Sequence, residues 1–280
     1  MQHPFFNKRR AFGFRALIFT PTRSRQVALG WLLSLFALTL AATAQARTAP
    51  ESFADLAERV LPIVVILSTS HVVGGAPDGD SFEELFRDFF ERRGGEDMPA
   101  IPRQRRQSSL GSGFIIDPEG YIVTNHHVVE GADEITVRLH DNTSLKAEVV
   151  GTDDKTDLAL LKVETSTPLP AAEWGNSDLA RVGAWVLAVG NPFGLGGTVT
   201  AGISSARQRD INAGPYDDFL QTDASINRGN SGGPTFNMDG QVIGVNTAIF
   251  SPSGGSIGIG FAIPSNMARG IIDSLREYGE

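Results

Sequence analysis

The sequence of 280 residues contains no cysteine, and this single absence excludes several classes of protein. Without thiols there is no disulfide scaffold, no thiolate zinc site, no iron–sulfur ligation and no cysteine nucleophile. Positive charge is also scarce, because 24 Lys and Arg face 32 Asp and Glu, which gives a formal charge of −8. An acidic chain is a poor general nucleic-acid binder, so we expect no nucleic-acid partner.

Sequence motifs for nucleotides and metals are missing as well. The phosphate-cradling loop G-x-x-x-x-G-K-[ST] does not occur, and neither does the zinc motif H-E-x-x-H. The adjacent His126 and His127 make a poor chelating pair. We therefore expect neither a cofactor nor a metal. The apolar content of 41% is ordinary for a globular protein and too high for a disordered chain of this charge.

The first 46 residues have the three parts of a secretory signal peptide. Met1–Ala46 contains six Lys and Arg but no Asp or Glu, and its basic part precedes the apolar run Val27–Leu40 and the small-residue site Ala44-Gln45-Ala46. We expect cleavage after Ala46 and a periplasmic location. A retained membrane anchor is the alternative, because the length of Val27–Ala44 is near the lower limit of about 17–18 residues for a membrane-spanning helix. Cleavage would leave 18 cations against 32 acids, a net charge of −14.

A helix and a strand are expected at the start of the mature chain. Ser52–Leu61 has apolar residues at helical spacing, with Ser52 as the N-cap candidate and Pro62 expected to end the helix. Ile63–Leu67 then predicts a buried strand.

A long stretch rich in Gly, Pro and charge follows, from His71 to Ser109. Within it, Ser81–Arg93 predicts a short helix with an aromatic stripe at helical spacing. Loops of this length tend to be functional or disordered. The stripe consists of Phe82, Leu85, Phe86, Phe89 and Phe90.

From Gly111 onward the pattern predicts an all-β protein, because short strand-like runs recur between turn signals. The connector Ser166–Pro170 separates two halves of about half a dozen strands each, a first barrel at about 61–165 and a second at about 171–264. Ser265–Tyr278 predicts a closing helix. The expected strands are Gly113–Asp117, Tyr121–Asn125, Glu134–Leu139, Lys146–Thr152, Leu158–Val163, Trp185–Val189, Gly197–Arg207, Phe219–Thr222, Val242–Ile249 and Gly258–Ile263.

The string Gly229-Asn230-Ser231-Gly232-Gly233-Pro234 is the most informative one in the sequence. A nucleophilic serine needs a sharply turning backbone that aims several N–H groups at the oxyanion of a tetrahedral intermediate. Flanking glycines permit that geometry. A glycine-rich hairpin with an incidental serine is the alternative interpretation.

A nucleophilic serine also needs a base and a carboxylate that orients it. His126 and His127 end a strand-like run, and on an extended chain adjacent residues cannot both face one site. Asp157 opens the strand-like Leu158–Leu161, whereas its rivals Asp153 and Asp154 are more typical of solvated turns. The chain order His, Asp, Ser within a two-halved β protein matches the chymotrypsin-like arrangement.

From Ser52 to its end, the sequence resembles the HtrA (Do-like, Deg) family of extracytoplasmic serine proteases. The resemblance implies a chymotrypsin-like double β-barrel with short N- and C-terminal helices and a long inserted loop. The motifs that carry it are Gly111–Ile116, Thr124-Asn125-His126-His127-Val128-Val129, Thr156–Leu161, Gly190-Asn191-Pro192-Phe193-Gly194-Leu195, Gln221–Pro234 and Gly258–Pro264.

The resemblance implies a role for each candidate. The histidine directly before the two valines, His127, corresponds to the base, Asp157 to the orienting acid and Ser231 to the nucleophile. The N–H groups of Gly229 and Ser231, with Asn230 between them, correspond to the oxyanion hole. The family usually has Asn where this chain has His126, which we interpret as a polar neighbour without an assigned role.

Substrate preference follows from the position six before the nucleophile. Trypsin-like relatives have an acid there and this chain has Ser225, so no buried carboxylate awaits a Lys or Arg side chain. With Ile226 and the segment Thr247-Ala248-Ile249 as walls, the pocket should prefer small aliphatic residues.

Assembly and regulation are implied by the resemblance alone. In the family the N-terminal segment, here Phe53–Leu61, helps to form a trimer. The inserted aromatics, here Phe82–Phe90, can reach another subunit's active site and hold it inactive, although a helix folded onto its own barrel is the alternative. Family members usually continue into PDZ domains, and no PDZ domain is present in this sequence, as in a natural single-domain form, a truncated product or a fragment.

The expected function is an ATP-independent serine endopeptidase that degrades unfolded or damaged proteins outside the cytosol. Its partners would be unfolded protein and peptide substrates and further copies of the same chain. One rival is a non-catalytic binder or chaperone with a distorted or blocked site. Another is a membrane-tethered protease, which differs only in whether the segment Val27–Ala44 is retained.

Overall fold

The computed structural model describes residues 49–72, 106–190, 197–211, 214–227, 229–252 and 255–279. Contacts divide the chain into the units Met1–Glu51 and Ser52–Glu280, and the fold described here belongs to the second unit. The predicted signal peptide and the predicted aromatic stripe Phe82–Phe90 lie outside the described residues.

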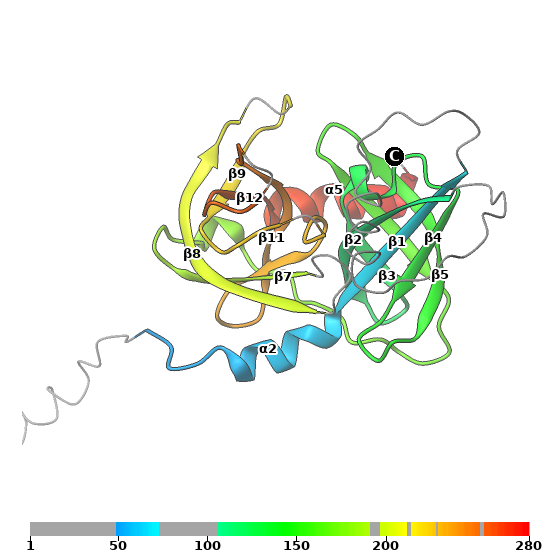
Figure 1. The fold of residues 1–280 in the computed structure, drawn as a ribbon, viewed down its shortest axis with the longest axis horizontal. Coiled ribbons are helices and arrows are strands. Elements are labelled where there is room, and N and C mark those ends of the chain that lie inside the picture. The colour runs from blue at the N-terminus through cyan, green and yellow to red at the C-terminus, as the bar shows by residue number, and fades with distance from the viewer. Residues whose placement is uncertain are drawn as a thin grey trace, which may run out of the picture. The chain divides into compact units, whose positions relative to one another are not determined.

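The first half of the unit is a closed barrel of six antiparallel strands in the order β1-β2-β3-β6-β5-β4 (Figure 1). Its strands are β1 Val64–Val72, β2 Arg106–Asp117, β3 Tyr121–Thr124, β4 Glu134–Arg138, β5 Ser144–Asp153 and β6 Leu158–Val163. The side chains that fill it are aliphatic, among them Leu67, Ile115, Ile122 and Leu161, which are fully buried. Burying such a side chain contributes about 1.5–3 kcal/mol.

The second half is another closed six-stranded barrel, with the cyclic order β7-β8-β9-β12-β11-β10. Its strands are β7 Trp185–Gly190, β8 Thr198–Arg209, β9 Phe219–Thr222, β10 Pro234–Phe236, β11 Val242–Ile249 and β12 Gly260–Pro264. This order repeats that of the first barrel with each strand number raised by six. The two halves therefore share one topology, which the sequence does not reveal as an internal repeat.

A shared hydrophobic core joins the two barrels and two helices. It combines Phe114 and Leu160 of the first barrel with Leu187 and Phe236 of the second, and α5 (Ser265–Tyr278) adds Ile272. The helix α2 (Ala54–Val60) contributes Leu56 and Val60 to the same cluster. This core positions the facing loops of the barrels, and these loops carry the candidate site.

Several element boundaries differ from the sequence-based prediction. The first helix begins at Ala54, and Phe53 occupies the N-cap position, although the Ser52 hydroxyl accepts the N–H of Ala54 at 3.0 Å. Pro62 does not end the helical stretch, since it lies inside the 3-10 turn Leu61–Ile63. The short strand β10 and a further helical turn, α4 (His126–Val129), were not predicted.

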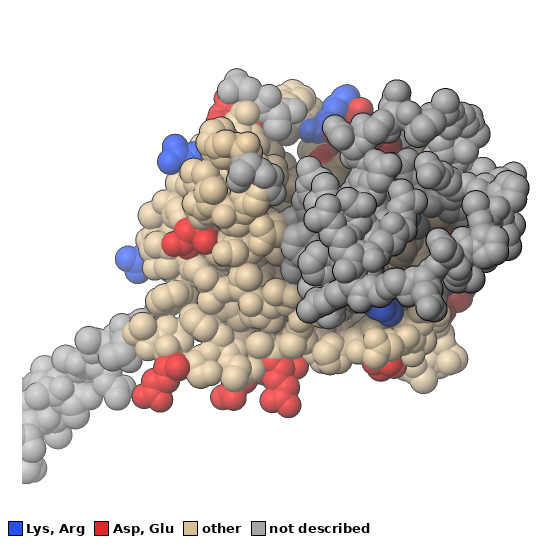
Figure 2. Space-filling view, in the orientation of Figure 1, with Lys and Arg blue, Asp and Glu red and all other residues tan. Residues whose placement is uncertain are grey.

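The predicted fold class is confirmed, because the unit consists of two six-stranded antiparallel β-barrels with a few short helices. Acidic side chains follow the edge formed by α2, and the surface is hollowed between the barrels at the opposite edge (Figure 2). Among the described residues, no helix is long and apolar enough to cross a bilayer.

Candidate active site

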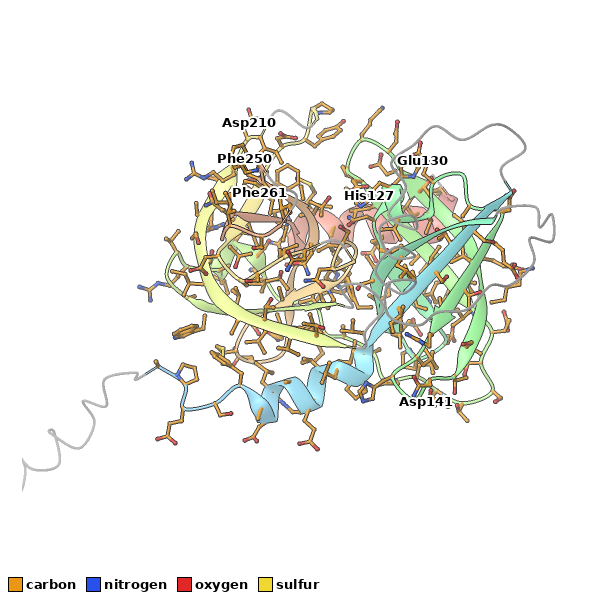
Figure 3. The ribbon with its side chains drawn as sticks, viewed as in Figure 1. His127, Glu130, Asp141, Asp210, Phe250 and Phe261 are labelled. Atoms are coloured by element: carbon orange, nitrogen blue, oxygen red, sulfur yellow. The ribbon has the colours of Figure 1, made fainter. Side chains whose placement is uncertain are left out.

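The turn of helix that carries both histidines begins directly after β3. The expectation of an extended chain at this point is wrong, because His126 and His127 open α4. Successive residues of a helix point about 100° apart, which separates the two imidazole rings. His127 faces the junction of the barrels (Figure 3), and His126 is half-buried beside it. The Nε2 atom of His126 lies 4.0 Å from a carboxylate oxygen of Glu130, and its buried Nδ1 has no partner among the described residues.

Asp157 is held in an unusual backbone conformation just before β6. Its φ of 57° is left-handed, which is uncommon for a residue other than glycine. Two hydrogen bonds to its carbonyl oxygen offset this strain, one from Asn125 Nδ2 at 2.8 Å and one from the His126 N–H at 3.2 Å. The turn therefore fixes Asp157 against the start of α4.

The carboxylate of Asp157 accepts hydrogen bonds from three donor groups. The ring Nδ1 of His127 lies 2.9 and 2.8 Å from its two oxygens, and the backbone N–H of His127 donates to Oδ1 at 3.0 Å. The hydroxyl of Thr247 on β11 donates to Oδ2 at 2.6 Å. The last bond joins the second barrel to the first.

Thr247 is a functional candidate that the sequence reasoning placed differently. It was expected as a wall of the substrate pocket, whereas its hydroxyl points at Asp157. The strand β11 shifts its pairing with β12 between Asn246 and Ala248, and Thr247 stands at this irregularity. A register shift of this kind leaves no signal in the sequence.

Two opposing effects act on the pKa of Asp157. Burial is the larger single effect and raises it, because a charged carboxylate is poorly solvated there. The hydrogen bond and positive potential of His127 lower it, as do the bonds from Thr247 and from the His127 backbone. The lowering effects together prevail, so the pKa of Asp157 is below its ordinary value and the group is ionised at neutral pH.

Ser231 lies in a loop before β10 that is fixed by the first barrel. The N–H of Ser112 on β2 donates to the Ser231 carbonyl at 2.9 Å, and the Ser112 hydroxyl donates to the Gly229 carbonyl at 2.6 Å. Gly232 has a φ of 82°, and a Cβ there would collide with the Ser112 carbonyl and the Thr124 hydroxyl. Glycine is therefore required at this position by both conformation and space.

The hydroxyl of Ser231 and two N–H groups of its loop form no strong hydrogen bond within the described residues. Its hydroxyl donates to the Thr247 carbonyl at 3.4 Å, and no hydrogen bond to His127 is found within the described residues. The N–H groups of Gly229 and Ser231 likewise have no acceptor in the described part of the chain. Asn230 is buried between them, with its backbone fixed by bonds to Asn227 and Gly233.

The residues predicted to select the substrate divide into two groups. Ile226 is buried in a small cluster with Ala188 and Ile243, and Ile249 packs against this cluster. Ala248, in contrast, lies on the His127 side together with Thr247. The predicted motif residues 191–195 and Arg228 lie outside the described part of the chain.

A pocket of about 300 Å³ opens between the barrels, and we name it the junction pocket. Its walls come from both barrels and from the start of α5, and Ser231 is not among them. It is lined by His126, His127, Asp154, Lys155, Thr156, Asp157, Ile211, Gly214, Tyr216, Asp217, Asp218, Phe219, Thr247, Ala248, Ile263, Pro264 and Met267. No cluster of side chains within the described ranges could hold a metal ion.

Two six-stranded barrels with a hydrogen-bonded histidine–aspartate pair and a glycine-flanked serine at their junction define the class of chymotrypsin-like serine proteases. Comparison with protein families agrees, because a trypsin-like peptidase domain matches residues 111–245. The chain belongs to the HtrA/DegP-like family of trypsin-like serine endoproteases.

Relatives and solved structures support this assignment. A probable periplasmic serine endoprotease DegP-like of Rickettsia conorii is 52% identical over 82% of this chain and 47% of its own length. A protein of the same description from Halomonas elongata is 48% identical over 91% of this chain and 56% of its own length. A variant of the HtrA-type protease AlgW, solved with a decapeptide, has a TM-score of 0.71 at 46% identity over 82% of this chain and 68% of that one. The chain spans about half the length of the curated relatives it matches.

Proposed function

We propose that the chain is an ATP-independent serine endopeptidase that degrades unfolded or damaged proteins in the periplasm. The observation that carries this proposal is the set of contacts that meets at Thr247, whose side chain bonds to Asp157 while its carbonyl receives the Ser231 hydroxyl. These contacts bring an acid, its histidine and a serine from two barrels to one place.

In the proposed mechanism, His127 acts first as a base. Its Nδ1 is engaged by Asp157, which leaves Nε2 to take the proton of the Ser231 hydroxyl as this attacks the substrate carbonyl. The bond from Ser231 to Thr247 is long and therefore weak, so turning the hydroxyl toward His127 costs little.

The remaining steps use the backbone and the same histidine. The N–H groups of Gly229 and Ser231 would hold the oxyanion of the tetrahedral intermediate. His127 would then donate its proton to the leaving amine, and water would release the acyl-enzyme by the reverse roles. The ionised Asp157 stabilises the imidazolium of His127 that forms both when the acyl-enzyme is made and when water releases it.

The proposal extends to location and assembly. The signal-like Met1–Ala46 and the description of the relatives as periplasmic support action outside the cytosol. Exposed apolar side chains support a homotrimer or a higher oligomer, because Phe53 packs on Trp185, and Leu179 and Val182, which precede Trp185 in the sequence, are exposed.

The test is the cleavage of an unfolded, cysteine-free model protein across a temperature series, by the mature chain and by its Ser231→Ala variant, without added cofactor. Cleavage by the parent that is absent in the variant supports a serine protease. The relevant readout is the appearance of new peptide termini, measured by mass spectrometry.

A peptide binder without proteolysis is the second candidate. It is favoured by one observation, namely that the Ser231 hydroxyl donates to Thr247 and not to His127 in the described residues. In that case parent and variant would both leave the model protein uncut and would suppress its aggregation equally.

A further inference from the structure

The junction pocket lies immediately beside the proposed base. His127 and Asp157 form one wall, and Ala248 of β11 forms another. Ile226, the predicted wall of the pocket for the residue at the cleaved bond, belongs to a different cluster and does not line it. The junction pocket is therefore separate from the cluster around Ile226 and adjoins the histidine–aspartate pair.

The geometry of an extended substrate relates the predicted Ile226 side of the site to the junction pocket. Successive side chains of a strand-like peptide point to opposite sides. When the residue that supplies the cleaved carbonyl directs its side chain toward Ile226, the residue before it directs its side chain toward His127. That direction leads into the junction pocket.

The lining of the junction pocket combines an apolar floor with an acidic rim. Phe219, Ile263 and Met267 are apolar, while Asp154 and Asp218 are exposed carboxylates at the rim. Neither carboxylate forms an ion pair with a cation of the described chain.

Both rim loops are braced by their own hydrogen bonds. Asp153 accepts the N–H of Lys155 at 3.1 Å and the hydroxyl of Thr156 at 2.7 Å, which fixes the first-barrel loop. Asp217 accepts the N–H of Ile211 at 2.9 Å in the second-barrel loop. These bonds fix the loop backbone that carries Asp154 and Asp218. Lys155 is a cation on the same rim and reduces its negative charge without reversing it, because the two carboxylates Asp154 and Asp218 outnumber it.

We propose that the junction pocket receives the side chain directly N-terminal to the residue at the cleaved bond, and that Asp154 and Asp218 select Lys or Arg there. This proposal rests on the proposed function. A long basic side chain places its aliphatic stem on the apolar floor and its charge among the carboxylates. An acidic side chain at the same place meets like charge and is disfavoured.

Quenched fluorescent peptides that differ only at this position test the selection. The position is Lys, Arg, Met or Glu, and the residue at the cleaved bond is Val throughout. Because exposed ion pairs are individually weak, two carboxylates are expected to raise kcat/KM for Lys over Met by about fivefold at low salt. The ratio should fall as sodium chloride screens the rim. The double variant Asp154→Asn/Asp218→Asn should bring the ratio to about one, through slower cleavage of the Lys peptide.

A matched control removes the same charge elsewhere. Glu148 on β5 and Asp239 in the β10–β11 turn are exposed and do not line the junction pocket, so Glu148→Gln/Asp239→Asn should keep the preference for Lys. Equal cleavage of the Lys and Met peptides by the parent would overturn the subsite while leaving the proteolysis intact. A preference that persists in the double variant would overturn it as well.

Binding to the Ser231→Ala variant separates the subsite from the chemistry. Fluorescence anisotropy with the same peptides should show tighter binding of Lys than of Met, again lost in the Asp154→Asn/Asp218→Asn background. If the parent cuts no peptide, the proposed function fails, and this binding ratio still decides the subsite. Equal affinities for Lys and Met refute it.

Discussion

Thr247 provides the sharpest test of how the site works, because a single hydroxyl there joins the two barrels at Asp157. The substitution Thr247→Val keeps the shape of the side chain and removes only its hydrogen bond of 2.6 Å to Oδ2. The carboxylate would retain its bonds from the ring and the backbone of His127. The change therefore isolates one of three donors.

The expected magnitude follows from the charge and burial of Asp157. A hydrogen bond to an ionised group contributes about 1.5–3 kcal/mol. The side chain of Asp157 is 27% exposed, so water replaces part of the lost bond and the lower end of this range applies. A loss of about 1.5–2 kcal/mol of transition-state stabilisation corresponds to a decrease of kcat by about 10- to 30-fold. KM should change little, because the hydroxyl is engaged by Asp157 rather than directed at substrate.

The assay is steady-state cleavage of a quenched peptide, with Thr247→Ser as the matched control. Serine keeps the hydroxyl and can reform the bond to Asp157, so the kcat of Thr247→Ser should stay within about twofold of the parent. A twofold change is far smaller than the decrease expected from the loss of one hydrogen bond. A Thr247→Val variant with more than half of the parental kcat would refute the reasoning. A Thr247→Ser variant as slow as Thr247→Val would show that the methyl group matters rather than the hydrogen bond.

Four further outcomes are expected. Gly232→Ala should lower the free energy of unfolding in urea by about 3 kcal/mol, because it adds left-handed strain to a collision with backbone; a loss below 1 kcal/mol would contradict this. Folding lowers the pKa of Asp157, so the ionised carboxylate stabilises the protein at pH values above the pKa of the unfolded chain, about 3.9. This contribution is lost as the pH falls through the lower pKa of the folded protein. Asp157→Asn should thus be less stable than the parent at pH 7, with the difference in melting temperature shrinking in acid. Deletion of Ser81–Arg93 should raise basal proteolysis of the model protein if this segment is inhibitory, and unchanged or lower activity would count against that role. The double substitution Leu179→Ser/Val182→Ser should reduce the mass measured by light scattering toward that of a monomer, and an unchanged mass would exclude this patch from the interface.

Most strands could be predicted because their signals are local. Leu158–Val163 and Trp185–Val189 alternate or concentrate β-branched and aliphatic residues between turn residues, and both are strands. The missed β10 has only three residues and begins with Pro234, which ordinarily argues against a strand. Its pairing with β7 and β11 is set by the barrel and not by its own composition.

The site was harder to predict where long-range contacts decide the local conformation. Asp157 and Ser231 could be proposed from chemistry and chain order, and the family resemblance selected His127 over His126. The helical turn at His126–Val129 could not, since the Asp157 carbonyl receives the His126 N–H from another part of the sequence. The bond from Thr247 to Asp157 spans 90 residues, and only the closed barrels bring these two side chains together.

The way the barrels share the site has a consequence for its control. The first barrel assembles His127 and Asp157 by itself, through a ring contact and a backbone bond. The alignment of Ser231 depends on bonds that cross between barrels, from Ser112 to the Ser231 and Gly229 carbonyls and from Thr247 to Asp157. The two bonds from Ser112 are between neutral groups and contribute about 1 kcal/mol each, whereas the bond to the ionised Asp157 contributes about 1.5–2 kcal/mol. The acid–base pair is thus assembled within one barrel. The position of Ser231 relative to this pair depends in part on the two bonds from Ser112, which a shift of the loop 229–233 would break. We therefore expect that substitution of Ser112, which removes its side-chain bond to the Gly229 carbonyl, lowers activity while the histidine–aspartate pair stays in place.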